Sequence, residues 1–98
     1  MEPQFNNRFD QYKKVSTYIK AISHPVRICI IMGLNRKKLC NVTDMKCQLD
    51  LPQSTVSTHL AVLRELDIIE PVRDGTEIFY KLHDQRAVQV LKILGVTE

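Results

Sequence analysis

The residues best suited to a chemical role form one polar stripe within residues 51–64. The stripe consists of Ser54, Thr55, Ser57, Thr58 and His59. These side chains are short hydrogen-bond donors and acceptors, and no carboxylate occurs anywhere in residues 51–64. Such a face suits contact with phosphates and base edges of nucleic acid, because it offers directional hydrogen bonds without negative charge. An ordinary amphipathic helix with a polar outer face fits the stripe as well.

The apolar residues of the same stretch predict the helix that presents this stripe. Val56, Leu60 and Leu63 stand at positions i, i+4 and i+7, the spacing of a helix with one buried face. Pro52 fits the first turn, where its missing N–H costs little. Gln53 and Arg64, at the two ends of the stretch, extend the predicted contact surface.

The three cysteines are the next candidates for chemistry. Cys29 falls in the most apolar stretch of the chain, so we expect a buried, unreactive thiol. Cys40 follows the basic residues 36–38, which could lower a thiol pKa, and with Cys47 it forms the candidate redox pair. If both lie on one helix, their Cα atoms stand about 10 Å apart, beyond the reach of a disulfide unless the helix opens.

An enzyme with a Cys–His nucleophile is one alternative function. Cys29, Cys40 and His59 supply the residue types, but nothing in their spacing selects them as a pair. No glycine-rich phosphate loop or carboxylate pair accompanies them. The sequence therefore predicts a protein that is not an enzyme, with His24 structural at a helix start and His83 on the surface.

Length and charge set the frame for these candidates. A chain of 98 residues predicts one domain over residues 1–98 with a modest core. The net charge of +3 is compatible with a polyanionic partner. No apolar run is as long as a membrane span, and residues 1–10 lack the apolar centre of a signal peptide, so a cytoplasmic location is expected.

Helices are predicted at both ends of the chain, at about residues 6–22 and 84–95. The first carries a stripe formed by Phe9, Tyr12, Val15, Ile19 and Ile22. Asn6 or Asn7 could cap the first helix, and Asp84 the last. Both helices are more apolar than a chain of this length can easily cover. A second copy of the chain could bury these faces, as could the chain's own core.

Between the ends, residues 26–34 predict a central helix that is apolar nearly all round. Gly33 and Asn35 favour its termination. Residues 36–38 then predict a basic loop, in which Lys37 and Lys38 either contact phosphates or form a solvated turn.

A second helix pair follows. Residues 41–48 predict a short helix with Val42 and Met45 directed inward. About four residues join it to the helix that bears the polar stripe. Two short helices with this connection, the second polar on its free face, predict a helix-turn-helix at about residues 41–65.

Residues 68–73 and 77–82 are rich in β-branched and aromatic side chains and predict a hairpin. Asp74 and Gly75 form the turn signal between them, and Pro71 must lie on an edge strand or at a strand start. This ribbon at about residues 68–82 reads as a wing, with Arg73, Thr76 and Lys81 near its tip and flank. The predicted fold is mainly α, a winged helix-turn-helix of order α-α-α-α-β-β-α with terminal helices for dimerisation.

Three separated motifs of the chain resemble the ArsR/SmtB family of small bacterial transcriptional regulators. They are residues 21–27 (AISHPVR), residues 51–60 (LPQSTVSTHL) with Leu63 and Arg64, and residues 79–82 (FYKL). The resemblance covers roughly residues 15–94. It implies a homodimer built on the first and last helices. It also implies a recognition helix from each subunit in the major groove, a wing along the DNA backbone, and repression of a nearby operon.

The chain departs from this family where metal-sensing members bind their ion. Asn41 and Thr43 occupy the positions of a Cys-x-Cys pair in members with a thiolate site, and Cys40 is shifted by one residue. In the last helix Asp84 matches the family ligand, but Arg86 replaces another and no His follows at the helix end. Residues 52–57 are also similar to those of metal-independent members such as the PagR type. We therefore expect no metal and no cofactor.

The sequence thus predicts a DNA-binding regulator, a homodimeric repressor on a palindromic double-stranded operator, with no membrane partner. The predicted DNA contacts are Gln53, Ser54, Thr55, Ser57, Thr58, His59, Arg64, Lys37, Lys38, Arg73, Thr76 and Lys81. Two alternatives stay open. One is a thiol-based redox-responsive or metal-responsive repressor of the same fold, and the other is a winged-helix module for protein–protein interaction.

Overall fold

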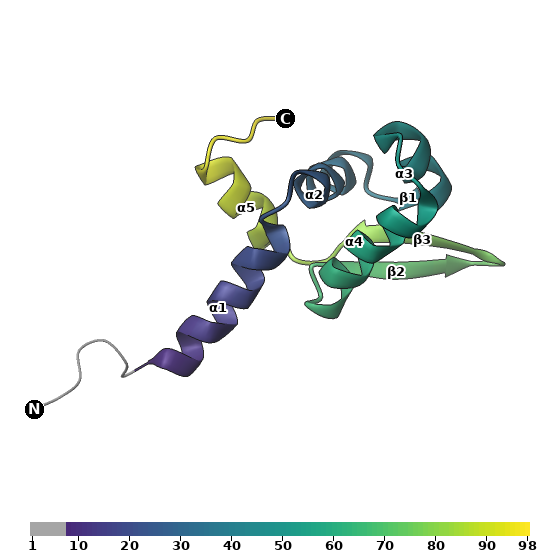
Figure 1. Cartoon of the computed structure of the whole chain (residues 1–98). Helices are drawn as coiled ribbons and strands as arrows, with labels where there is room; N and C mark the ends of the chain where they lie inside the picture. Colours follow the sequence, from purple (N-terminus) through teal and green to yellow (C-terminus); the bar gives the residue numbers. More distant parts are fainter. Residues whose placement is uncertain (1–7) are drawn as a thin grey trace, which may run out of the picture.

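A computed structural model describes residues 8–98, and Figure 1 shows their arrangement. The elements follow in the order α1–α2–β1–α3–α4–β2–β3–α5. This order confirms the predicted mainly α winged helix-turn-helix. It also adds β1, a strand of two residues that no sequence pattern of that length could reveal.

The terminal helices α1 (Phe9–Ile22) and α5 (Gln85–Ile93) lie near each other at one end of the molecule (Figure 1). α1 ends at the predicted residue, whereas its predicted start and its caps Asn6 and Asn7 lie outside the described residues. The predicted cap of α5 is confirmed, because Asp84 Oδ1 accepts the N–H of Arg86 at 3.0 Å.

The central helix α2 (Pro25–Lys37) runs further than predicted. It begins as expected, with His24 Nδ1 accepting the N–H of Val26 at 3.1 Å and Pro25 in the first turn. The predicted end near Gly33 and Asn35 is wrong, since both lie inside the helix. Burial of Ile30, Ile31 and Leu34 outweighs the cost of about 1 kcal/mol for an internal glycine. The helix closes instead at Lys38, whose φ is 73°.

The helix-turn-helix consists of α3 (Val42–Leu49) and α4 (Gln53–Glu65). Asn41 caps α3, because its Oδ1 accepts the N–H of Asp44 at 2.8 Å. Asp50 ends α3 in the left-handed conformation, with φ of 54°. Pro52 precedes α4 as its N-cap instead of opening its first turn, and this places Gln53 at the start of the helix.

The three strands form one antiparallel sheet of order β1–β3–β2, in which β1 is Cys40–Asn41, β2 is Ile69–Asp74 and β3 is Glu77–Leu82. The β2–β3 ribbon is the predicted wing, with a register running from Ile69 opposite Leu82 to Asp74 opposite Glu77. Its turn is Gly75–Thr76, one residue later than predicted, with Gly75 at φ of 63°. Pro71 lies on an edge strand, as expected.

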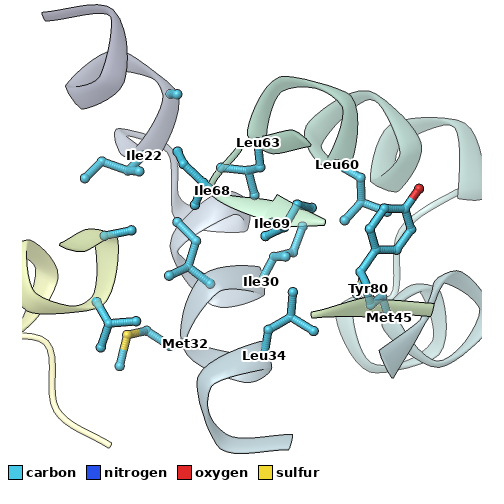
Figure 2. Close-up of a cluster of buried hydrophobic side chains, with 14 of the residues drawn as sticks. Ile22, Ile30, Met32, Leu34, Met45, Leu60, Leu63, Ile68, Ile69 and Tyr80 are labelled. Carbon is cyan, nitrogen blue, oxygen red and sulfur yellow. The ribbon is translucent and has the colours of Figure 1, made fainter. Parts of the chain in front are cut away.

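The core joins α2 to α4 and to the base of the wing (Figure 2). Its largest fully buried side chains are Ile31, Leu34, Leu63, Ile68, Ile69 and Val56. Each such side chain contributes about 1.5–3 kcal/mol relative to an exposed one. Since Val56, Leu60 and Leu63 of α4 are all in this cluster, the core fixes which face of α4 looks outward.

Candidate nucleic-acid interface

The outward face of α4 carries most of the predicted polar stripe. The exposed predicted contacts on this helix are Gln53, Ser54, Ser57, Thr58 and Arg64. Ala61 is exposed in their midst, and Figure 1 shows α4 lying across the ribbon of β2 and β3. The small Ala61 leaves room for a close approach, and its methyl group suits contact with a thymine methyl.

A hydrogen bond within α4 limits what the hydroxyl of Thr58 can offer to a ligand. Thr58 Oγ1 donates to the carbonyl of Ser54 at 2.9 Å, so Thr58 has only acceptor lone pairs left for a ligand. Within residues 8–98, no side chain caps the start of α4. The N–H of Thr55 donates to the carbonyl of Pro52 at 3.1 Å, so the N–H groups of Gln53 and Ser54 are the ones available to a phosphate, where the positive end of the helix dipole adds to the attraction.

Two members of the predicted stripe do not lie on the exposed face. Thr55 is half-buried, and His59 is only 9% exposed. His59 does not lie on the outer face where the sequence placed it: its Nδ1 accepts from Nε of Arg27 at 3.1 Å and its ring centre lies 4.4 Å from that of His24. This imidazole joins α4 to α2 in the interior.

The surroundings of His59 disfavour its charged form. Burial lowers the pKa of His59, and the nearby His24 and Arg27 lower it further. Arg27 is itself fixed by a second hydrogen bond, from Nη1 to the carbonyl of Ala21 at 3.3 Å. The cluster therefore requires a neutral imidazole.

We expect the free energy of unfolding to fall as the pH drops below about 6.5. Below that pH, the unfolded chain binds a proton on His59 more readily than the folded chain does. The free energy of unfolding therefore decreases as the pH falls from about 6.5 toward the lower pKa that His59 has in the folded state. Urea unfolding at a series of pH values, on the wild type and on His59→Gln, measures this. His59→Gln should flatten the decline. An unchanged decline in His59→Gln contradicts the assignment.

The wing tip carries mixed charge. Arg73 and Thr76 are exposed there, as predicted, but the acidic residues Asp74 and Glu77 flank the turn. Asn41 Nδ2 donates to Glu77 Oε1 at 3.1 Å, which ties the start of α3 to the wing. Arg73 thus remains the one cation of the tip in the described chain, and it acts against two nearby carboxylates.

The structure does not group the other predicted cations with the wing tip. Lys81 lies toward the base of the ribbon, opposite Glu70, and its Nζ is 3.2 Å from Glu70 Oε1. This ammonium also lowers the pKa of Glu70. Lys37 belongs to the last turn of α2 and not to the predicted loop, whereas Lys38 caps that helix and lies in the short connection to β1.

Both expectations for the cysteines need correction. Cys29 is exposed on α2 and not buried, whereas Cys40 is buried in β1 and shares no helix with Cys47. Burial raises the pKa of the Cys40 thiol, and Lys37 opposes this only in part. Cys40 therefore lacks the low pKa that the redox hypothesis requires. His59 accepts from Arg27 and Cys40 contacts the carbonyl of Asn41, so no Cys–His pair is built from these residues.

The residues at the family's metal positions serve other purposes. Asn41 caps α3, and Asp84 is held by the guanidinium of Arg86 and by the hydroxyl of Tyr18, which donates at 3.0 Å. The bond with Arg86 lowers the pKa of Asp84 to about 2, while burial raises the pKa of Tyr18 to about 12. In residues 8–98, no group of three or more His, Cys, Asp and Glu side chains could hold a metal ion.

Sequence reasoning missed three residues that shape this surface. Arg27 stood out as a lone cation in an apolar helix, which is a signal for a buried polar partner. Asn41, three residues before Asp44, matched the spacing of a capping box. Ala61 gave no signal, since alanine fits any helix position.

A helix-turn-helix whose second helix, α4, is free of carboxylates up to Arg64, set beside a two-stranded wing, defines a winged-helix DNA-binding transcriptional regulator. Residues 24–70 match the arsR family of bacterial regulatory proteins. The transcriptional repressor PagR of Bacillus anthracis is 37% identical over 77 residues, covering 79% of this chain and 77% of PagR. The chain belongs to the arsR family.

Further relatives and solved structures agree with this membership. The biofilm growth-associated repressor of Xylella fastidiosa is 35% identical over 81 residues, covering 83% of this chain and 70% of that repressor. The crystal structure of PagR superimposes with a TM-score of 0.76 at 32% identity, covering 90% of this chain and 100% of PagR. NolR of Sinorhizobium fredii shares the fold, with a TM-score of 0.87, 23% identity and coverage of 96% of this chain and 93% of NolR.

None of the helices in residues 8–98 is long and apolar enough to cross a bilayer.

Proposed function

We propose that this protein is a cytoplasmic repressor that binds a palindromic DNA operator as a homodimer and needs no metal to do so. The observation that carries the proposal is the exposed face of α4, which offers hydroxyl and amide groups without a carboxylate before Glu65. Two named relatives, PagR and the biofilm growth-associated repressor, are repressors, which supports the same direction of control here.

Apolar faces on the terminal helices support the homodimer. On α1, a single stripe of large side chains is more than half exposed, and it consists of Phe9, Tyr12, Val15 and Ile19. On α5 and just after it, Ile93 is 83% exposed and Leu94 is 74% exposed. Exposed apolar surface of this extent on neighbouring helices marks an interface, and a twofold dimer covers both faces with one contact.

Selection from a random library of DNA duplexes tests the proposed function. The protein should enrich a twofold-symmetric sequence whose half-sites lie about 10–10.5 base pairs apart, because two recognition helices of a dimer are spaced by about one DNA turn. An unsymmetric single site, or no enrichment over the input library, contradicts the proposal.

Metal independence gives a separate prediction. Stoichiometric zinc, cadmium or arsenite should change operator affinity less than twofold, because the positions of the two family metal sites hold Asn41, Thr43 and an ion-paired Asp84. Fluorescence anisotropy on the selected duplex, with and without each metal, measures the change. A tenfold loss of affinity would contradict the prediction and would direct attention to Cys40 and Cys47.

A further inference from the structure

A hollow of about 280 Å³ lies between α2, β1 and α3. Its lining contains no residue of α4 or of the wing, and Lys37 is the one predicted DNA contact among its lining residues. Ile30 and Leu34 of α2 and Met45 and Leu49 of α3 form its apolar wall. Sites for drug-sized ligands occupy roughly 300–1,000 Å³, so this hollow fits a molecule at or below the small end of that range.

The charged part of the lining is entirely positive. Arg36 and Lys37 both line the hollow, and no Asp or Glu does. Within residues 8–98, neither cation takes part in an ion pair, in contrast to Lys81, Arg86 and Lys92. These two side chains therefore sit beside an apolar wall without a direct ion pair, and Arg36 is near enough to Glu98 to help lower the pKa of that carboxyl.

Gly33 enlarges the hollow from the side of α2. A Cβ built at this glycine meets no atom within 4 Å, so the space above it is open. No backbone requirement calls for glycine there, because the residue lies within a regular helix. A larger side chain at this position would project into free space and would not displace a neighbour.

We infer that this hollow binds a small amphipathic carboxylate, with its apolar body against α2 and α3 and its carboxylate beside Arg36 and Lys37. Desolvated apolar surface supplies the attraction for the body, and the two cations select the charge of the head group. α3 is the first helix of the helix-turn-helix and packs on α4. This step rests on the proposed function. A ligand that binds the DNA-free arrangement of α2 and α3 more tightly than the DNA-bound one lowers the affinity of the protein for DNA. DNA then lowers the affinity of the protein for the ligand by the same factor.

The two exposed cysteines allow a test without DNA. Cys29 lines the hollow, whereas Cys47 is exposed on α3 and does not line it, so it serves as an internal control. With octanoate as the probe at about ten times its Kd, alkylation of Cys29 by iodoacetamide should slow about tenfold while that of Cys47 stays unchanged. Acetate has the charge without the chain and 1-octanol the chain without the charge, so both should protect Cys29 far less.

Variants locate the site. Arg36→Gln combined with Lys37→Gln should raise the Kd for octanoate about tenfold, and Lys46→Gln, a cation on α3 outside the lining, should leave it unchanged. Gly33→Leu should abolish protection of Cys29. If circular dichroism shows that Gly33→Leu does not fold, the Kd of the double variant for octanoate tests the site instead.

Three results of the alkylation and variant experiments overturn the inference. They are equal protection of Cys29 and Cys47, protection by 1-octanol as strong as by octanoate, and an unchanged Kd in the double variant. Amide NMR shifts confined to α1 and α5 on adding octanoate would also overturn it, since they place the probe on the exposed apolar faces instead. Because the assay contains no DNA, its failure is distinct from a failure of operator binding.

Discussion

Replacing Ile19 with glutamate is expected to convert the dimer into a monomer and to weaken operator binding by at least about 100-fold. Ile19 is 51% exposed on the apolar stripe of α1, so its substitution does not disturb the buried core. A carboxylate buried without a partner at the dimer contact costs several kcal/mol. Loss of the second recognition helix then removes an avidity gain of about 10²–10⁴.

Thr17→Glu is the matched control for this variant. It introduces the same charge two residues away, at an exposed position on the same helix but off the apolar stripe. For Thr17→Glu, sedimentation equilibrium at micromolar concentration should show a dimer, and fluorescence anisotropy should show the same operator affinity as the wild type. If Ile19→Glu remains dimeric, or if it is monomeric and still binds operator as tightly as the wild type, the dimer through α1 and α5 is contradicted.

Ser57→Ala and Arg73→Ala are expected to separate sequence reading from backbone contact. Ser57 is exposed on α4, with no charge, so it can add a directional hydrogen bond to a base but no long-range attraction. Its loss should cost about 1–3 kcal/mol on operator DNA and little on random DNA. Arg73→Ala, at the wing tip, should lower the affinity for both DNAs alike. It should also reduce the salt slope by about one for each protomer.

Titration of both variants on operator and random duplexes over a salt series measures these effects. The acidic neighbours of Arg73 supply a further comparison, because Asp74→Asn should strengthen binding to both DNAs as a repelling charge is removed. Ser57→Ala weakening both DNAs equally would remove Ser57 from the reading surface. A loss confined to operator in Arg73→Ala would mean that the wing reads sequence.

The amphipathic pattern predicted the architecture well. Val56, Leu60 and Leu63 repeat at helical spacing, and the same three side chains bury in the core and turn the opposite face outward. The hairpin was predictable because Pro71 and Gly75 have narrow backbone requirements that only a few positions satisfy. These local rules agree with the tertiary fold at each of those elements.

The remaining differences come from contacts between elements distant in sequence. His59 looks like part of a polar stripe until Arg27, 32 residues earlier, supplies the hydrogen bond that accounts for its burial. The end of α2 depended on the core and not on Gly33. Cys40 forms part of strand β1 because it pairs with Tyr80 of β3. Local propensity carries no information about such partners.

The affinity ratio between operator and scrambled duplex at physiological salt tests the central claim most directly. A specific regulator of this class should bind the selected operator at least about 10³-fold more tightly than the scrambled sequence, with two protomers in each complex. Equal affinity for the two duplexes, with a strong salt dependence on both, would show that α4 reads no sequence and would contradict the account.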